Sequence, residues 1–566
     1  MSVVAGHAAG ADLHARKQEF VPRRPTGAQD GNLKGDELMT DRSADYSGAD
    51  KGYTDTDKRE DVQVLHNMGY AQELDRRLSR FSNFAVSFSI ICILSGGINS
   101  LAQATSGAGG FGIGVGWLVG CFVSLVFAVA MSQIASAYPT AGGLYHWGSI
   151  LGNRGTGWVT AWLNLLGLVT VLGAINVGTW TFFIGAFGAT LGIENTLVNQ
   201  TIFLIVITGA QALINHLGIR LTAQLTDFSG YLIFATSIAI AIVCLIAADT
   251  WDFGRLFTFT NYSGEPGGNV WPAVSGLWVF LLALLLPIYT ITGYDASAHT
   301  SEETIKAARS VPRAMVMSVV WSAVFGYLFL AAFVLMVPSL EEAAAQGWNV
   351  FFWAFDSEVN PIVKQLLYLA IFIAQLLCGL ATVTSASRMI FAFARDRGLP
   401  GSRALSKVSP KYRTPVAAVW TGAALSVLFV WGASLISIAG TTAYTIVVSC
   451  TVIFLFLSFT FPITLGLLAW GTSKWDRMGP WNMGRAVFSL FAVLSILSMI
   501  LIFVIGVQPP NDKALWITVG FFILTAIVWF AFENRRFRGP PIGDMIANRQ
   551  AEIRAAEAAV GETVKV

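Results

Sequence analysis

The feature that most constrains this chain is a series of twelve apolar runs, each close to the length of a membrane-crossing helix. A helix needs about 20 consecutive apolar residues to cross the hydrocarbon core of a bilayer. Hydrophobic residues make up 54% of the 566 residues and charged residues only 12%, about half the usual charged share of soluble proteins. The sequence therefore predicts an all-α integral membrane protein with twelve transmembrane helices, ten of them within 84–469 and two within 486–532.

The positions of lysine and arginine predict the orientation of these helices. If the N-terminus lies inside the cell, almost all Lys and Arg residues around the spans fall on inner loops, and the outer loops hold only Arg255, Lys364 and Lys513. Cytoplasmic loops of membrane proteins are enriched in both residue types. We therefore expect a multi-pass protein of the plasma (cytoplasmic) membrane with both termini in the cytoplasm.

The segments outside the apolar runs are polar. Residues 1–61 are rich in Gly, Asp and Lys/Arg and lack the apolar stretch of a secretory signal peptide. We expect a disordered cytoplasmic tail there, and a second cytoplasmic tail at 533–566. Within 62–83, Leu74 and Leu78 would share one face of a short helix and arginines another, which predicts an interfacial lead-in helix.

Two of the predicted spans carry glycine and hydroxyl residues at or beyond mid-length. The first span contains the run Ser95–Gly97, and the sixth contains the run Thr290–Gly293. A single glycine in a membrane helix most often permits close helix packing, whereas an interrupted helix is tolerated only where it lines a protein cavity. Because the two spans hold corresponding positions, we expect two inverted five-helix repeats, about 84–248 and 273–469, with the ligand between their broken leading helices.

Asp295 stands near the end of the sixth span, where a carboxylate has two interpretations. It could lie in water at the inner interface, because the polar residues of "SAHTSEET" follow it closely. It could instead be a buried functional group, because an unwound segment lengthens the path per residue and keeps this position inside the membrane. We favour the buried interpretation for Asp295 and the interfacial one for His299.

Four motifs resemble those of the amino acid–polyamine–organocation permeases, and most closely those of their amino acid/choline transporter branch. They are "SGGINSLAQATSGAGG" in the first span, "PTAGGLYHWGSILGNRGTGW" after the second, "TGYDASAHTSEETIKAARSVPRAM" at the end of the sixth and "ASRMIFAFARDRGLPGSRALSKVSPKYRTPVAA" after the eighth. The resemblance runs from about Leu74 to Phe532. It implies a leucine-transporter-type fold, with a five-plus-five inverted repeat and two further C-terminal helices, and a secondary active transporter that works by alternating access.

The resemblance also implies a substrate site at the two breaks. In such permeases the backbone N–H groups at the break of the first helix receive the substrate carboxylate, and carbonyl groups of the broken sixth helix receive its ammonium. Tyr289 matches an aromatic lid, whose ring face suits a cation. The expected substrate is an amino acid or a small derivative such as 4-aminobutyrate, and the alternatives are choline, another quaternary amine or a polyamine. The residues expected to contact it are Ser95, Gly96, Gly97, Tyr289, Thr290, Thr292 and Gly293.

The coupling ion has two candidates. Many relatives carry a lysine in the fifth helix in place of a sodium ion, whereas this chain has Ile233 near that position. Asp295 matches a position where several proton-coupled relatives carry Glu, and a poorly solvated carboxylate favours its protonated form. We therefore expect proton coupling through Asp295. Sodium is the alternative, with the hydroxyls of Thr384 and Ser385 as its candidate site, although such hydroxyls usually bond to their own helix.

Arg388 and Asp396 lie at the end of the eighth span, where charge has an ordinary explanation. Cations near a helix C-terminus are favourable, and inner loops are enriched in them. The alternative is a gate, in which Asp396 pairs with an arginine of a neighbouring loop in only one transport state.

Other function classes find little support in the sequence. None of the six histidines lies in a metal-ligand pattern such as HExxH, so we expect no enzyme, no cofactor and no metal site. A net charge of +2 gives no basis for nucleic acid binding. A nutrient sensor on the same fold stays open, and it would bind substrate without accumulating it.

Overall fold

The described part of the chain is built almost entirely from helices. The computed structural model describes residues 53–264, 270–436, 443–475, 477–509, 511–541 and 544–562. Within these residues, eleven helices are long and apolar enough to cross a membrane. In chain order they are α2 with α3 (Arg80–Ile91 and Ile93–Asn99), α5 with α6 (Gly110–Gly114 and Gly116–Ala137), α8 with α9 (Arg154–Phe183 and Ala189–Leu191), α10 (Leu197–His216), α11 (Ile219–Ala247), α15 (Ala307–Met336), α18 (Pro361–Arg395), α20 (Val416–Ile436), α21 (Ala443–Ala469), α22 (Arg485–Gly506) and α23 with α24 (Lys513–Val528 and Asn534–Arg536).

The predicted sixth span, 273–298, is divided into short helices and is not among these eleven. Its first half is α12 (Gly276–Ala283) and α13 (Leu285–Thr290), and α14 (Ala296–His299) follows after a gap. The stretch formed by α12 and α13 is apolar but shorter than a bilayer crossing. The structure thus confirms an all-helical membrane fold, while the count of twelve crossing helices stays a prediction.

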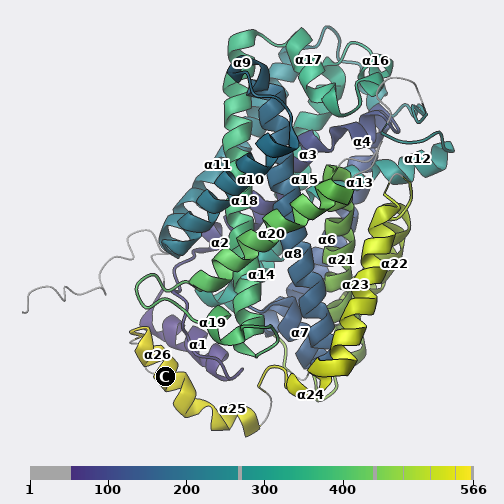
Figure 1. Ribbon diagram of the computed structural model, residues 1–566. Coiled ribbons are helices and arrows are strands. Elements are labelled where there is room, and N and C mark those ends of the chain that lie inside the picture. Colours follow the sequence, from purple (N-terminus) through teal and green to yellow (C-terminus); the bar gives the residue numbers. More distant parts are fainter. Residues whose placement is uncertain are drawn as a thin grey trace, which may run out of the picture. The chain divides into compact units, whose positions relative to one another are not determined.

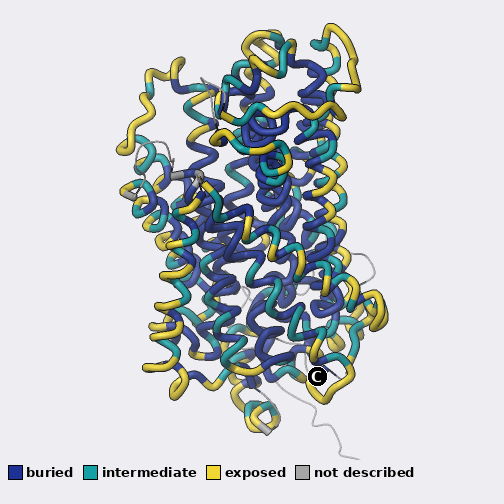
Figure 2. Tube along the Cα trace, turned by 90° about the vertical axis from the view of Figure 1, so that its right-hand side faces the viewer, coloured by how far each residue is buried: buried dark blue, intermediate teal, exposed yellow. Residues whose placement is uncertain are grey.

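Four of the five corresponding helix pairs of the two predicted repeats pack directly against each other. With the divided segment counted as the sixth, contacts join the first to the sixth (α3 with α13) and the second to the seventh (α6 with α15). Contacts also join the third to the eighth (α8 with α18) and the fourth to the ninth (α10 with α20). Such pairing is expected when a two-fold axis in the membrane plane relates the halves. Figure 2 shows buried segments running through the middle of this bundle.

Local sequence explains where several of the long helices begin. The side chains of Ser79, Asn153 and Thr196 each accept a backbone N–H in the first turn of α2, α8 and α10. Asn360 caps α18 in the same way, and Pro361 occupies the first position of that helix, where a missing N–H costs little. The helix starts are therefore specified by the chain close to each start.

The chain ends differ in part from their prediction. Residues 1–52 of the expected disordered tail lie outside the described residues. The rest of that tail is not disordered, because α1 (Asp55–His66) begins there with a capping box formed by Thr54 and Asp57. The C-terminal tail contains two helices, α25 (Asp544–Asn548) and α26 (Gln550–Ala559).

The predicted lead-in helix at 62–83 was wrong for the residues between α1 and α2. These residues are not helical, and Leu78 forms an isolated parallel bridge with Thr304. The N–H groups of Arg77 and Leu78 donate to the carbonyl of Glu303, at 2.9 and 2.8 Å. Backbone groups must find partners somewhere, and here a distant segment supplies the partners that a helix would have supplied.

The two ends of the helix bundle carry different elements. Figure 1 shows α16 (Leu340–Ala345) and α17 (Val350–Glu358) at one end and α1 with α26 at the other. We call the second end the charged end, because two buried ion pairs form there, Glu302–Arg395 and Glu303–Arg388. It is the end that the sequence predicts to be cytoplasmic.

Candidate functional site

The first span is broken at Cys92, between α2 and α3. Cys92 has a φ of 26°, a positive value that residues other than glycine rarely adopt. Its carbonyl accepts the N–H groups of Ser95 and Gly96, at 2.7 and 3.1 Å. The remaining backbone N–H groups of the first turn of α3 belong to Ile93 and Leu94, and the Cys92 carbonyl does not accept from them.

The sixth segment is broken between α13 and α14. Gly293 lies in this gap with a φ of 104°, which glycine adopts without strain. The hydroxyls of Thr290 and Thr292 each donate, at 2.7 Å, to the carbonyl four residues earlier. These bonds pair two carbonyls in the last turns of α13. The next carbonyls, those of Tyr289 and Thr290, lie at the end of the helix and can accept a hydrogen bond from a ligand.

The two breaks lie against each other. A Cβ atom at Gly96 would come within 2.8 Å of the Cα atom of Thr290, and one at Gly293 within 2.3 Å of the side chain of Ile90. Both glycines therefore permit close approach of the two chain segments. The N-terminal end of α3, which carries positive partial charge, thus lies beside the C-terminal end of α13, which carries negative partial charge.

The other predicted contact residues surround this point. Ser95 and Tyr289 keep 4% and 6% of their surface exposed. A Cβ atom at Gly97 would lie 3.1 Å from the ring of Phe329, so Gly97 packs against α15. The structure therefore brings Ser95 and Gly96 to the end of α13 and turns Gly97 away from it.

Polar and aromatic side chains from other helices gather beside the breaks. Gln375 of α18 donates to a backbone carbonyl of α3 at 3.2 Å and accepts from Asn99 at 3.4 Å. The hydroxyls of Ser100 and Tyr444 lie 3.1 Å apart, and the ring of Tyr444 meets that of Tyr289 edge to face at 6.4 Å between centroids. Sequence reasoning missed Gln375 and Tyr444. A glutamine within the apolar run of the eighth span was the available signal.

Asp295 and His299 are both fully buried in the protein. The interfacial position expected for His299 was wrong, because α14 lies inside the bundle. Nε2 of His299 is 3.4 Å from Oδ2 of Asp295, and Nδ2 of Asn164 donates to the same oxygen at 3.2 Å. The other carboxyl oxygen has no hydrogen-bond partner among the described residues.

The surroundings of His299 fix where its hydrogen lies. Its Nδ1 is 3.1 Å from the carbonyl oxygen of Ala141. A carbonyl can only accept, so we assign the ring hydrogen of the neutral tautomer to Nδ1. Nε2 then has a lone pair on the side of the ring nearest Oδ2 of Asp295, and it has no hydrogen-bond partner among the described residues.

Thr384 and Ser385 do not meet at a common site. The hydroxyl of Thr384 donates to Oδ1 of Asn215 at 2.8 Å, away from the first helix. The hydroxyl of Ser385 is buried and has no partner in the described part of the chain. Beside the break of the first helix, α18 instead presents Cys378, whose Sγ lies 3.3 Å from the carbonyl of Ile90. Across the described residues, no group of three or more His, Cys, Asp or Glu side chains could hold a metal ion.

Comparison with known proteins identifies the family of the chain. A family model described as amino acid permease matches residues 78–532. The chain belongs to this family. The amino-acid permease BAT1 homolog of Oryza sativa subsp. japonica is 30% identical over 501 residues, which cover 84% of this chain and 94% of that protein. The amino-acid permease BAT1 of Arabidopsis thaliana is 30% identical over 502 residues, covering 84% of this chain and 95% of that protein.

A solved structure shares the fold of the permease. It is MhsT in complex with L-phenylalanine, which matches with a TM-score of 0.53 and 16% sequence identity over 74% of this chain and 98% of MhsT. The match confirms the leucine-transporter-type fold. The family model and the curated relatives confirm the resemblance to the amino acid–polyamine–organocation permeases.

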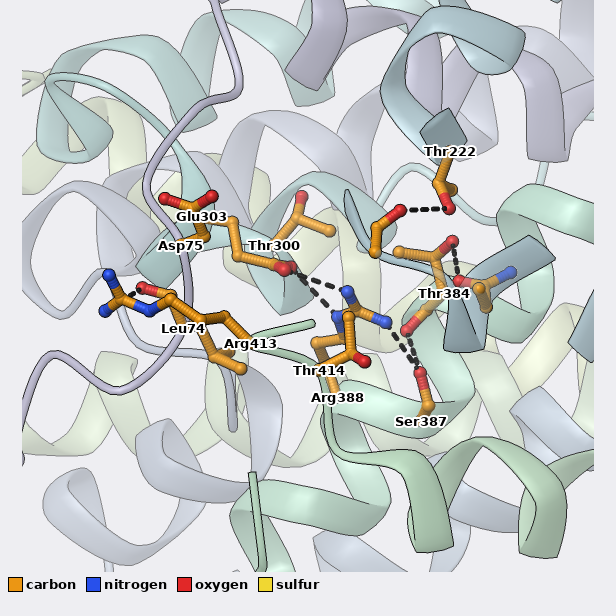
Figure 3. A network of polar contacts seen from close by, with 12 residues as sticks. Leu74, Asp75, Thr222, Thr300, Glu303, Thr384, Ser387, Arg388, Arg413 and Thr414 are labelled. Atoms are coloured by element: carbon orange, nitrogen blue, oxygen red, sulfur yellow. Dashed lines mark hydrogen bonds and ion pairs between the residues drawn. The ribbon is translucent and has the colours of Figure 1, made fainter. Parts of the chain in front are cut away.

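Arg388 of the permease lies in a buried ion pair at the charged end. Its Nε lies 2.9 Å from Oε2 of Glu303 and its Nη2 lies 2.8 Å from Oε1. Neither side chain has any exposed surface, and Nη1 also donates to Ser387 (Figure 3). Arg395 and Glu302 form a second two-bond pair, in which Nη1 and Nη2 donate to Oε2 and Oε1 at 3.1 and 2.8 Å. Sequence reasoning missed both glutamates, and their adjacency after the sixth segment was the available signal.

Asp396 lies in a second buried cluster at the charged end. Its Oδ2 accepts from the hydroxyls of Tyr70 and Tyr145, at 2.6 and 2.9 Å, and lies 3.3 Å from Nε2 of His146 in α7 (Leu144–Leu151). Burial lowers the pKa of His146. Burial alone would raise the pKa of Asp396, but the bond with His146 and a nearby guanidinium outweigh burial and lower it. The gate hypothesis expects an arginine partner for Asp396. Arg549 is the candidate, but its Nη1 is 3.9 Å from Oδ1 of Asp396, farther than the two tyrosine hydroxyls and His146.

Both ends of the described chain are fastened to this part of the permease. Glu557 of α26 lies 2.6 Å from Nε2 of His66 in α1 and accepts the N–H of Gln72 at 3.0 Å. Arg413 contacts Glu562 at 3.0 Å and donates to the carbonyl of Leu74 (Figure 3). The segment before α2 is thus held between α26 and the main bundle.

Proposed function

We propose that this permease is a secondary active transporter that moves amino acids or small amino-acid derivatives across the plasma membrane by alternating access. The observation that carries the proposal is the meeting of two broken helices at Gly96 and Thr290. Breaks within membrane helices leave backbone donors and acceptors for a ligand and mark the site between inverted repeats. The relatives named amino-acid permeases support the substrate class.

The zwitterionic part of the substrate fits the two helix ends. The carboxylate binds at the first turn of α3, where Ile93 and Leu94 hold donors and the Ser95 hydroxyl adds another. The ammonium lies at the carbonyl end of α13, beside the rings of Tyr289 and Tyr444, whose faces attract cations. Each charge of an amino acid then meets the complementary end of a helix dipole.

Competition experiments test the substrate class. Uptake of a labelled amino acid into proteoliposomes is measured against a panel of amino acids, 4-aminobutyrate, choline and putrescine. The proposal predicts that compounds carrying both a carboxylate and an amine compete best. Competition by choline or putrescine alone would favour the amine alternative. Binding without accumulation would identify a sensor.

Proton coupling through Asp295 is the second part of the proposal. Asp295 and His299 face each other across 3.4 Å in a fully buried position. One proton placed between them satisfies the carboxyl oxygen and Nε2 together, whereas its loss leaves two lone pairs opposed or a buried charge unpaired. Proton uptake and release at this pair therefore changes the stability of the packing around α14. The Thr384 hydroxyl bonds to Asn215 of α10, away from the break of the first helix, so the sodium alternative has weaker support.

The coupling test uses proteoliposomes with an imposed pH gradient and no sodium. We expect the wild type to accumulate substrate and Asp295→Asn to lose the dependence on the gradient. The matched control is Asp227→Asn, which removes another carboxylate within a membrane helix, bonded to Ser82 at 3.0 Å. The control should keep gradient-driven uptake. Accumulation by the wild type only with sodium, or full pH dependence in Asp295→Asn, would contradict the proposal.

The charged end serves in this proposal as the cytoplasmic gate. The buried pairs Glu303–Arg388 and Glu302–Arg395 hold α14 and the segment after it against α18. Opening toward the cytoplasm separates these groups and hydrates them.

Both chain ends then lie in the cytoplasm, so a protease added outside intact cells should leave α1 and α26 uncut.

A further inference from the structure

A groove of about 440 Å³ lies between α2, α11 and α15 near the charged end. Two arginines line it, Arg80 from α2 and Arg313 from α15, together with the apolar side chains of Phe84, Phe234 and Trp321. The groove is separate from the helix breaks, and no residue of the proposed substrate or gate sites lines it.

The two arginines of the groove have no partner among the residues that the structure describes. Both are exposed, and neither has a hydrogen bond or ion pair with any described residue. Arg388, Arg395 and Arg413 of the charged end, in contrast, each pair with a glutamate. Enrichment of cations on inner loops accounts for their side of the membrane, but not for two cations from different helices meeting at one groove.

The helix position of Arg80 also favours an external anion. Arg80 is the first residue of α2. Cations are unfavourable in the first turn of a helix, where the dipole is positive. A bound anion would relieve this helix end, and Arg313 of α15 would supply a second positive charge to it.

The apolar part of the groove continues along α15 away from the arginines. Arg313, Met317 and Trp321 follow at four-residue spacing and so share one helix face, with Trp321 about 12 Å along the axis from Arg313. Met317 and Trp321 are each 43% exposed. The ring of Phe234 completes this wall, 6.4 Å from the ring of Trp321.

We propose that this groove binds an anionic glycerophospholipid of the cytoplasmic leaflet. The phosphate lies between Arg80 and Arg313, and one acyl chain follows the apolar wall past Trp321. A cationic mouth above an apolar wall matches this amphipathic ligand in both charge and order. The lipid bridges α2, the first half of the broken first helix, and α15, which carries no break. The binding does not depend on the proposed transport function.

Fluorescence quenching tests the site through Trp321. The protein is titrated in detergent with brominated phosphatidylglycerol or brominated phosphatidylcholine, and the signal of Trp321→Phe is subtracted to isolate Trp321 from the other tryptophans. The attraction between one cation and an anionic lipid is expected to raise the affinity about fivefold for each arginine. Phosphatidylglycerol should therefore quench Trp321 at about 25-fold lower concentration than phosphatidylcholine.

Charge variants then decide whether the two arginines are responsible. Arg80→Gln/Arg313→Gln should abolish the preference, while Arg80→Lys/Arg313→Lys should keep most of it. Arg309→Gln is the matched control, because Arg309 is exposed on the same helix but does not line the groove. Equal quenching of the wild type by both lipids would overturn the proposal. It would also be overturned if the glutamine pair kept the preference, or if Arg309→Gln lost as much of it as that pair.

Discussion

Neutralising Glu303 should destabilise the closed state of the charged end. Glu303 and Arg388 share bonds of 2.8 and 2.9 Å, and neither side chain is exposed. Glu303→Gln keeps the shape but leaves the charge of Arg388 buried and unpaired, which costs about 3–5 kcal/mol. If only the closed state carries this cost, the ratio of closed to open molecules falls by about 10²–10⁴-fold.

Cysteine accessibility measures this shift. Ala298 is small and fully buried in α14, so Ala298→Cys provides a reporter, and the five native cysteines are all buried. In inside-out vesicles, a membrane-impermeant methanethiosulfonate reagent should label the reporter at least about tenfold faster in Glu303→Gln. Arg536→Gln is the control, because that arginine is 46% exposed in its pair with Glu533 and such pairs contribute less than about 1 kcal/mol.

A double variant distinguishes two costs: the loss of the ion pair itself, and the burial of one charge that has lost its partner. Glu303→Gln/Arg388→Gln removes both charges and should label more slowly than either single variant. Unchanged labelling in Glu303→Gln, at wild-type expression, would refute the reasoning, because the pair would then contribute nothing to closure.

Two other substitutions and one pH experiment test separate parts of the permease. Gly96→Val should abolish uptake at normal expression, because its side chain would collide with Thr290; wild-type uptake would contradict the proposed contact. Tyr444→Leu removes a ring whose face attracts the substrate ammonium in this proposal, an attraction worth about 1 kcal/mol, and should raise the KM of uptake about fivefold; an unchanged KM would place the ammonium elsewhere. Burial raises the pKa of Glu557, but its bond to His66 outweighs burial and lowers it below the usual 4.5. Docking of α26 should therefore be stable above pH 4.5 and weaken as the pH falls further, which protease cleavage at graded pH would measure, and a flat cleavage profile would contradict this.

The two helix breaks could be predicted from sequence only in approximate position. Gly293 lies in the sixth break and adopts the positive φ that its residue type suggests. The first break, however, falls at Cys92 and not at the glycines. Gly96 instead serves the close approach to Thr290. Glycine in a sequence indicates either role, and only the neighbouring helix decides between them.

The partners of the central polar groups could not be predicted from local pattern. Asp295 and His299 stand one helical turn apart, so their contact was accessible from spacing. Asn164 and Gln375 reach the breaks from the third and eighth helices, and their position depends on tertiary packing. The same limit explains the error before α2. The amphipathic pattern there favours a helix, but bonds to Glu303 from a distant part of the chain prevail.

The backbone bonds at Leu78 join the start of the first broken helix to the end of the sixth. Arg77 and Leu78 donate to the carbonyl of Glu303, and Ile305 donates to the carbonyl of Leu78 at 3.0 Å. These bonds use peptide groups alone, so side-chain replacement leaves them in place, and only proline removes a donor. If they persist through transport, α2 and the chain beyond α14 move as one rigid unit. Permeases with entirely different side chains in this stretch can then share the same inner-gate motion, and an alanine scan across it would overlook the connection.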